Sequence, residues 1–229
     1  MVDSFPRQIN FERSVDRALS AADPDVDEAE EGQARYSCSA RELAVVPVVR
    51  QIWTMPLLVV LTGPIAAGKN TVADALAKRL TDRGKTVVVA DVDDVAAMVS
   101  TPGAAQAGLR FAAHEAHGAL VGQWMRSGVD YVVVVGPIYT EEEQAALTCA
   151  LPDDAVALWA VIDATVAVTF ARAQADPSRG LSREPDFHHA AHRRFRDLLP
   201  AIPADHAFNS EEMAAEQIAT AIEATIGAL

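Results

Sequence analysis

From Met55 onward, short runs of aliphatic and β-branched residues alternate with longer alanine-rich stretches, and glycine or proline stands between them. The hydrophobic runs predict strands over Leu57–Thr62, Thr86–Ala90, Tyr131–Val135, about Ala157–Ile162 and near Ala207. The stretches between them predict helices over about Lys69–Arg83, from Asp91–Asp94 through Val99, over Ala104–Arg126, from Thr140 to Leu151, after Asp163, and over Ser210–Ile226. Strands that alternate with helices are typical of a parallel sheet with crossover helices. We therefore expect an α/β fold with a five-stranded parallel sheet flanked by helices.

Residues 1–54 differ from the rest of the chain in composition. The stretch Asp23–Glu31 holds six acidic residues among nine and almost no apolar residue. Such a stretch cannot bury enough apolar surface to fold by itself. We expect residues 1–54 to form a flexible N-terminal extension and residues 55–229 to form the folded domain.

Composition limits where the protein acts and what it binds. No apolar run approaches the roughly 18–20 residues of a membrane span, and Met1–Leu19 has no apolar signal core. Cys38 and Cys149 are the two cysteines, and they lie too far apart to form a disulfide framework or a zinc site of the cysteine type. We expect a protein of the reducing cytoplasm with no membrane partner.

The charge balance is strongly acidic. Asp and Glu number 32 against 19 Lys and Arg, which gives a formal charge of -13. A surface of this kind repels phosphate backbones over most of its area, so it excludes an extended nucleic-acid surface. The segment Arg172–Arg196 is an exception, because it holds six arginines against three acidic residues.

A glycine loop between the first strand and the first helix carries the clearest chemistry. Residues 63–71 are Gly-Pro-Ile-Ala-Ala-Gly-Lys-Asn-Thr, which fits the GxxxxGK part of the Walker A pattern. Backbone N–H groups of such a loop and the N-terminus of the following helix bind polyphosphate. The residues that we expect to bind phosphate are Gly63, Ala66, Ala67, Gly68, Lys69, Asn70 and Thr71. Asn70 departs from the pattern, because a Ser or Thr that holds Mg²⁺ normally stands there, and we expect weakened or water-mediated metal contact.

Acidic residues follow the second strand. In an extended stretch Asp91 and Asp93 point the same way, toward the crevice at the carboxyl edge of the sheet. We interpret Asp93 as the base that accepts a proton from an attacking hydroxyl, and Asp91 with Asn70 as the metal partners. The alternative is that Asp93 or Asp94 only caps the following helix.

The basic segment 172–196 is polar and rich in helix breakers, which is typical of a lid. Arg172, Arg179 and Arg183 would close over a nucleotide and neutralise charge on its phosphates. The alternative is a solvated mobile loop.

Two stretches of the chain contain histidines at helical spacing. Arg110, His114 and His117 are spaced to share one helix stripe, so Arg110 and His114 are candidates for contact with the acceptor, although a solvated polar face explains them equally well. His188 and His192 also share a face, but without a nearby cysteine or a carboxylate at ligand spacing we do not expect zinc.

These motifs resemble those of the small P-loop kinases that include shikimate and gluconate kinases, chloramphenicol phosphotransferase and zeta-toxin-like proteins. The resemblance covers about Met55–Leu229 and rests on the Walker A loop, the Asp-x-Asp, the Val-Val-Gly-Pro after the third strand and the arginine segment with its Ser-Arg-Glu-Pro. It implies an AAA-type ATP-binding domain with the fold of the nucleoside monophosphate kinases, which uses ATP and Mg²⁺ to phosphorylate a hydroxyl of a small-molecule acceptor.

The resemblance also implies individual roles. Lys69, Asp93, and Arg179 or Arg183 would be catalytic, and Arg172, Asn209 and Ser210 would contact the nucleotide, the last two beside the adenine. Gly136, where other P-loop proteins carry a Walker B acid, would line the acceptor site with Arg110 and His114.

Three functional hypotheses follow. The first is a phosphotransferase for a small acceptor. The second is a nucleotide-binding regulatory or toxin-type protein that acts through a partner, and the third is a kinase for nucleosides or nucleic-acid ends. The sequence indicates neither the acceptor nor an oligomeric state.

Overall fold

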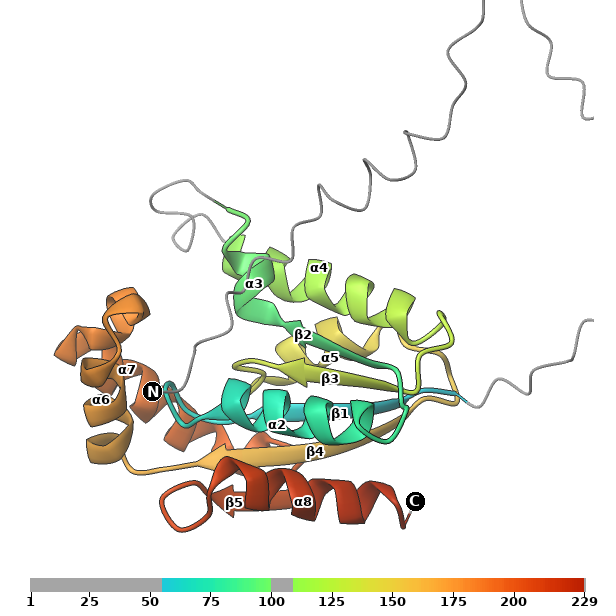
Figure 1. The fold of residues 1–229 in the computed structure, drawn as a ribbon. Helices are drawn as coiled ribbons and strands as arrows, with labels where there is room; N and C mark the ends of the chain where they lie inside the picture. The colour runs from blue at the N-terminus through green and yellow to red at the C-terminus, as the bar shows by residue number, and fades with distance from the viewer. Residues whose placement is uncertain (1–54, 100–108, 229) are drawn as a thin grey trace, which may run out of the picture. The chain divides into compact units, whose positions relative to one another are not determined.

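A five-stranded sheet lies at the centre of the computed structural model, which describes residues 55–99 and 109–228 (Figure 1). All pairings are parallel and the strand order is β2-β3-β1-β4-β5. The strands are β1 Leu57–Thr62, β2 Val87–Asp91, β3 Tyr131–Val135, β4 Val156–Asp163 and β5 His206–Asn209. The predicted fold class is confirmed, and the predicted extension of residues 1–54 lies outside the described residues.

Helices follow each strand. The α-helices are α2 Lys69–Thr81, α3 Val92–Ala96, α4 Leu109–Trp124, α5 Glu141–Thr148, α6 Val166–Ala175, α7 Pro185–Leu198 and α8 Ala215–Ile226, and short 3₁₀ helices are η1 Pro177–Arg183 and η2 Leu199–Ala201. None of these helices has the length and apolarity that a membrane span requires.

The predicted helix starts agree with the structure at α5 and differ at α6 and α8. Thr140 caps α5 as predicted, and its side chain and that of Glu143 form a reciprocal capping box. Asp163, predicted to cap α6, instead ends β4, and Thr165 is the cap residue. Ser210, predicted to begin α8, precedes it by five residues, because residues 210–214 form a turn first. The predicted start of α4 at Ala104 lies outside the described residues.

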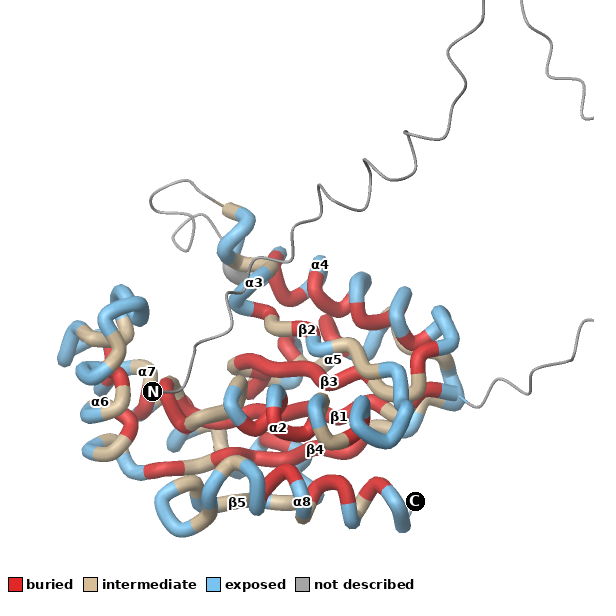
Figure 2. Tube along the Cα trace, viewed as in Figure 1, coloured by how far each residue is buried: buried red, intermediate tan, exposed pale blue. Residues whose placement is uncertain are grey.

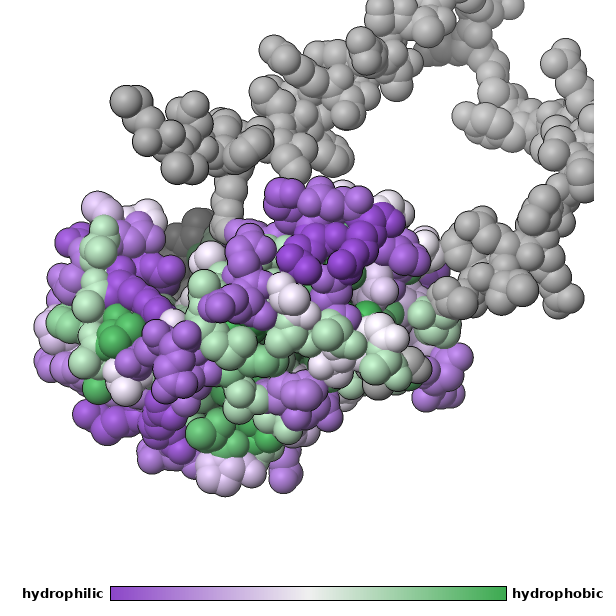
Figure 3. All heavy atoms as spheres, turned by 60° about the horizontal axis from the view of Figure 1, so that its bottom comes forward, coloured by the Kyte–Doolittle hydropathy of each residue, from purple (hydrophilic) through white to green (hydrophobic). Residues whose placement is uncertain are grey.

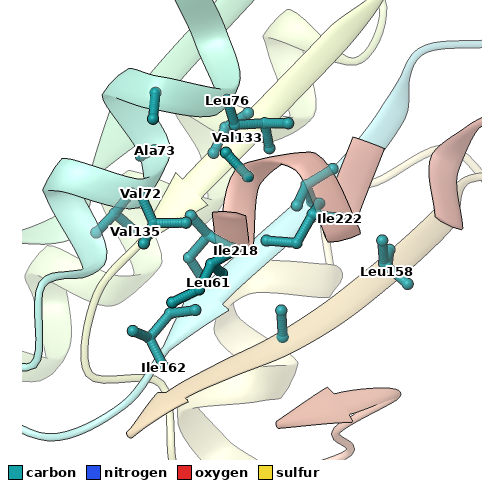
Figure 4. Close-up of a cluster of buried hydrophobic side chains, with 14 of the residues drawn as sticks. Leu61, Val72, Ala73, Leu76, Val133, Val135, Leu158, Ile162, Ile218 and Ile222 are labelled. Carbon is teal, nitrogen blue, oxygen red and sulfur yellow. The ribbon is translucent and has the colours of Figure 1, made fainter. Parts of the chain in front are cut away.

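The core has two halves because the sheet is buried on both faces. Val59 and Leu61 of β1 pack with α2 and α8 on one face, and this cluster is drawn in Figure 4. Leu58 and Val60 point the other way, into a cluster with α4 and α5. The alternation follows from the two-residue period of a strand. Figure 2 shows the buried strands enclosed by helices whose outer sides are exposed.

The arginine-rich segment 172–196 is mostly helical, although its sequence is rich in helix breakers. It comprises the end of α6, then η1, then most of α7, and these elements lie at the carboxyl end of the sheet (Figure 1). Phe195 of α7 is fully buried with Tyr139, Val161 and Ile202, so α7 is anchored to the sheet by its apolar face. Hydrophilic side chains gather over α6, η1 and α7 on the face shown in Figure 3. The polar residues of this segment include the exposed face of the amphipathic helix α7, and such a face has the same composition as a loop.

Candidate functional site

The glycine loop connects β1 to α2 with a backbone that turns through several positive φ angles. Gly63 and Gly68 have φ values of 145° and 100°, and Ala66 has 57°. A Cβ atom on Gly63 would lie 2.0 Å from the carbonyl oxygen of Ile162 in β4, so only glycine fits there. The loop thus curls tightly over the neighbouring strand, and Lys69 is the first residue of α2.

Lys69 folds back onto its own loop. Its Nζ donates hydrogen bonds to the carbonyl oxygens of Gly63 at 3.0 Å and Pro64 at 2.9 Å. Burial lowers the pKa of the Lys69 ammonium to about 8, the nearby carboxylates of Asp93 and Asp91 oppose this shift, and Arg179 adds to it. The ammonium therefore lies in a desolvated position, where a polyphosphate would be a stronger partner than two carbonyls.

Asp91 and Asn70 are in direct contact. The side-chain amide of Asn70 donates to Oδ2 of Asp91 at 2.6 Å, while Oδ1 of Asp91 accepts the backbone N–H of Asp93 at 2.9 Å. Two residues that we had assigned to metal binding from separate segments are thus brought together at the carboxyl edge of β2. Amide and carboxylate oxygens are the ligands that Mg²⁺ prefers.

The reasoning that placed Asp91 and Asp93 on one side of an extended stretch was wrong. The strand ends at Asp91, and α3 begins at Val92 with Asp91 as its cap, so Asp93 lies in the first helical turn. The alternative, that Asp93 or Asp94 caps the helix, was wrong as well, since Asp91 does so. Both Asp91 and Asp93 still lie close enough to Lys69 to influence its pKa.

Arg172 and Ser210 hold the phosphate loop from the side of α6 and β5. Arg172 donates to the Ala67 carbonyl at 3.2 Å and to Oγ and the carbonyl of Ser210 at 2.9 and 2.8 Å. Ser210 Oγ also donates to the Ala67 carbonyl, at 2.8 Å. Asn209 instead bonds within its own turn, to the Glu211 N–H and the Glu212 carboxylate. The structure thus joins Arg172 and Ser210 to the loop but leaves the Asn209 side chain in local contacts.

Tyr139 was not among the expected site residues. Its hydroxyl donates to the Gly63 carbonyl at 2.7 Å, the same oxygen that Lys69 contacts. Its ring packs edge-on against Phe195 at 5.5 Å between centroids. The only sequence signal was an aromatic residue shortly after the Gly136-Pro137 turn, and the loop contact spans 76 positions.

Comparison with known proteins places this arrangement in a family. Residues 58–199 match the model of the AAA domain family, and this range contains the loop, both carboxylates and the arginines of α6 to α7. The chain belongs to the AAA domain family. A search of curated proteins found no match.

Solved structures with a similar fold include small kinases. Shikimate kinase from Acinetobacter baumannii, in complex with shikimate, is 19% identical with a TM-score of 0.53, and the match covers 76% of this chain and 94% of that one. The APS kinase CysC of Mycobacterium tuberculosis, in complex with AMPPNP and APS, is 14% identical with a TM-score of 0.57 over 76% and 98% of the two chains. Shikimate kinase from Bacteroides thetaiotaomicron is 15% identical with a TM-score of 0.56 over 75% and 98%. This AAA domain protein therefore has the small P-loop kinase fold.

The two predicted lid arginines of this AAA domain protein differ in their surroundings. Arg179 forms an ion pair with Asp176, at 3.2 Å between Nε and Oδ2, and lies close enough to Lys69 to lower its pKa. Arg183 is half-buried, its carbonyl accepts from Gln174 at 2.6 Å, and its Nε has no hydrogen-bond acceptor in the described part of the chain. Of these two arginines, Arg179 is the one that influences the pKa of Lys69.

Helix α4 carries two of the predicted acceptor residues, Arg110 and His114. The Arg110 side chain lies outside the described part. His114 and His117 are buried, so the solvated polar face that we had allowed is wrong. His117 donates from Nε2 to the Ala90 carbonyl at 3.1 Å, and burial lowers its pKa. His117 therefore lies at the end of β2.

Gly136 has a packing reason to be glycine. A Cβ there would lie 2.2 Å from Cγ1 of Val92, the first residue of α3. The end of β3 thus lies against the start of α3, beside Asp91 and Asp93.

The histidines of α7 have protein partners. His188 donates from Nδ1 to the Ser182 carbonyl at 2.9 Å, and its Nε2 lies 3.0 Å from Thr169 Oγ1. His192 donates to the Ala164 carbonyl at 3.0 Å. They tie α6, η1 and α7 together, and no metal-holding group of three or more His, Cys, Asp or Glu was found within the described ranges.

Proposed function

We propose that this protein is a phosphotransferase that moves the γ-phosphoryl group of ATP to a hydroxyl of a small-molecule acceptor with the assistance of Mg²⁺. The observation that carries the proposal is the desolvated Lys69 ammonium, held by the loop carbonyls with Asp91 and Asp93 beside it. Among structurally similar proteins, the solved complexes name shikimate, APS and AMPPNP as ligands. They support a small acceptor and an adenine nucleotide.

The loop and Arg179 supply the phosphate side of the reaction. Backbone N–H groups around Gly68 and the N-terminus of α2 would bind the phosphates. Lys69 would move from the Gly63 and Pro64 carbonyls to the β- and γ-phosphates, because negatively charged phosphate oxygens attract an ammonium more strongly than neutral carbonyl oxygens do. Arg179, already within electrostatic range of Lys69, would neutralise charge that develops on the transferred group.

Asp91 and Asn70 fit a Mg²⁺ ion. Mg²⁺ keeps several waters and takes one or two carboxylates plus substrate phosphates, so a full cage of protein ligands is not required. The Asp91 carboxylate and the amide oxygen of Asn70 would hold the ion directly or through water. When bound, it would supply positive charge to the β- and γ-phosphate oxygens.

Asp93 is the proposed base. The acceptor oxygen attacks the γ-phosphorus, the bond between that phosphorus and the β–γ bridging oxygen breaks, and ADP leaves. The acceptor hydroxyl proton passes to the Asp93 carboxylate. Position in the first turn of α3 keeps Asp93 near Lys69 while Asp91 caps the same helix.

Turnover and thermal-shift measurements with ATP, Mg²⁺ and a panel of hydroxylated acceptors test the proposal. Lys69→Met should remove stabilisation by nucleotide, whereas Asp93→Asn should keep it and lower transfer by about 10²–10⁴-fold. Lys78→Met is a matched control, because Lys78 lies on α2 but is exposed and paired with Asp82. Equal stabilisation of the wild-type and Lys69→Met proteins by nucleotide would contradict the proposal.

A second candidate function is a nucleotide-binding regulator that acts through a partner with little turnover. One observation favours it, namely that the Asn70 amide occupies an oxygen of the proposed metal ligand Asp91. Stabilisation by nucleotide without transfer to any acceptor in the same screen would favour this function.

A further inference from the structure

Two donors share the carbonyl oxygen of Gly63. Lys69 Nζ reaches it at 3.0 Å and Tyr139 Oη at 2.7 Å. The oxygen lies at the first residue of the phosphate loop, where β1 ends and the chain passes under Ile162 of β4. Each donor satisfies one of the two lone pairs of this carbonyl.

The two donors differ in how firmly they are held. Lys69 has a long flexible side chain and a second acceptor in the Pro64 carbonyl. Tyr139 is 4% exposed, and its ring packs edge-on against Phe195 and under the guanidinium of Arg194, 5.4 Å from the ring centroid. The hydroxyl of Tyr139 is therefore fixed by contacts that do not involve the loop.

The backbone of Tyr139 is fixed as well. Its N–H donates to Glu143 at 2.7 Å, and the same carboxylate accepts from Arg194 at 2.7 Å. Burial alone would raise the pKa of Glu143, but the Tyr139 N–H, the Arg194 guanidinium and the Thr140 N–H together hold it below its usual value. A charged Glu143 thus anchors both Tyr139 and the arginine that covers its ring.

In the proposed function, Lys69 turns from the Gly63 and Pro64 carbonyls to the phosphates of the nucleotide. A buried carbonyl left without a donor costs free energy that is subtracted from the binding of the ligand. We propose that Tyr139 is a positioning residue of the phosphate loop, whose hydroxyl keeps the Gly63 carbonyl hydrogen-bonded when Lys69 moves to the phosphates of a bound nucleotide. This inference rests on the proposed function.

Removal of the hydroxyl affects the free and the bound protein differently. In Tyr139→Phe, Lys69 is the one side-chain donor left to the Gly63 carbonyl among the described residues, so nucleotide binding would leave this carbonyl bare. Asp93, Asp91 and Arg179, the charged groups that face Lys69, stay in place.

Calorimetric titration of the full chain with the non-hydrolysable analogue AMPPNP tests the inference. Tyr139→Phe should weaken binding at pH 7 by about three- to tenfold, the size of one hydrogen bond. Tyr131→Phe is the matched control, since Tyr131 begins β3 at the opposite end of the strand from Tyr139, and it should leave the affinity unchanged.

A double-mutant cycle separates positioning from general support of the fold. In the ligand-free protein, Tyr139→Phe should lower the melting temperature more in a Lys69→Met background than in the wild-type background, because the Gly63 carbonyl then loses its second donor as well. Wild-type AMPPNP affinity in Tyr139→Phe, or an equal loss of melting temperature with and without Lys69, would overturn the inference. Failure of the wild-type chain itself to bind AMPPNP would overturn the proposed function and this inference with it.

Discussion

The side-chain amide of Asn70 lies 2.6 Å from Oδ2 of Asp91 and donates a hydrogen bond to it. Asn70 is the second residue of α2, the helix after the phosphate loop, and Asp91 ends β2, which is two positions from β1 in the sheet. An amide in this position both orients the carboxylate and competes with a cation for it. Asn70, the residue at which this chain departs from the Walker A pattern, is therefore hydrogen-bonded to Asp91, the proposed metal ligand.

Substitution of Asn70 by serine should increase the affinity of the site for Mg²⁺. A hydroxyl binds the ion directly and releases Oδ2 of Asp91 from the amide, so the Mg²⁺ concentration for half-maximal nucleotide binding should fall about three- to tenfold. Titration of Mg²⁺ at fixed AMPPNP measures this. Asn70→Leu, which removes both amide functions, should raise the concentration instead, and a fall in both variants would show that the amide only obstructs the site.

Nucleotide affinity should depend on pH through Lys69. The pKa of Lys69 is about 8 in the free protein, and bound phosphates raise it, so binding above pH 8 takes up a proton. Affinity should be constant below about pH 7.5 and fall by up to about tenfold per pH unit above pH 8. In Lys69→Arg the guanidinium stays charged, and the decline should disappear. A decline that persists in this variant would assign the titration to another group.

Glu143 should contribute stability that depends on pH. Because its folded-state pKa lies below its usual value, the contribution is complete above the unfolded pKa and is lost as pH falls through the folded one. Glu143→Gln should lower the free energy of unfolding at pH 7 by about 1–3 kcal/mol, and the difference from wild type should narrow near pH 3–4. Urea denaturation at both pH values measures this. The exposed neighbour Glu142, changed to glutamine, serves as the control, and a gap that stays constant with pH would contradict the assignment.

Gly136 should tolerate no side chain. The Cβ atom of Gly136→Ala would meet Cγ1 of Val92 at 2.2 Å, and φ of 157° adds strain, so we expect a loss of about 1–3 kcal/mol of stability. Val92→Ala in the same chain should recover part of this loss, because it removes the contacting methyl group. Thermal unfolding of the two single variants and the double variant measures the recovery. Strict additivity would mean that the cost of Gly136→Ala does not come from Val92.

The order of elements and the phosphate loop could be predicted from the sequence because their causes are local. Val-rich runs such as Tyr131–Val135 form buried strands wherever helices cover both faces, and the glycines at 63 and 68 meet a backbone requirement that no other residue meets as readily. Thr140 likewise caps α5 with groups only three residues apart.

The partners of these residues were decided by tertiary structure alone. Tyr139 meets Gly63 across 76 positions, and His117 meets Ala90 across 27, so no local pattern records either contact. Asp93 lies in a helix because β2 ends at Asp91. The arginine-rich segment is anchored as a helix because Phe195 is buried beside Tyr139 and Val161. Local rules determined which residue types occupy each turn and strand end, whereas burial and long-range hydrogen bonding selected which of them meet at the phosphate loop.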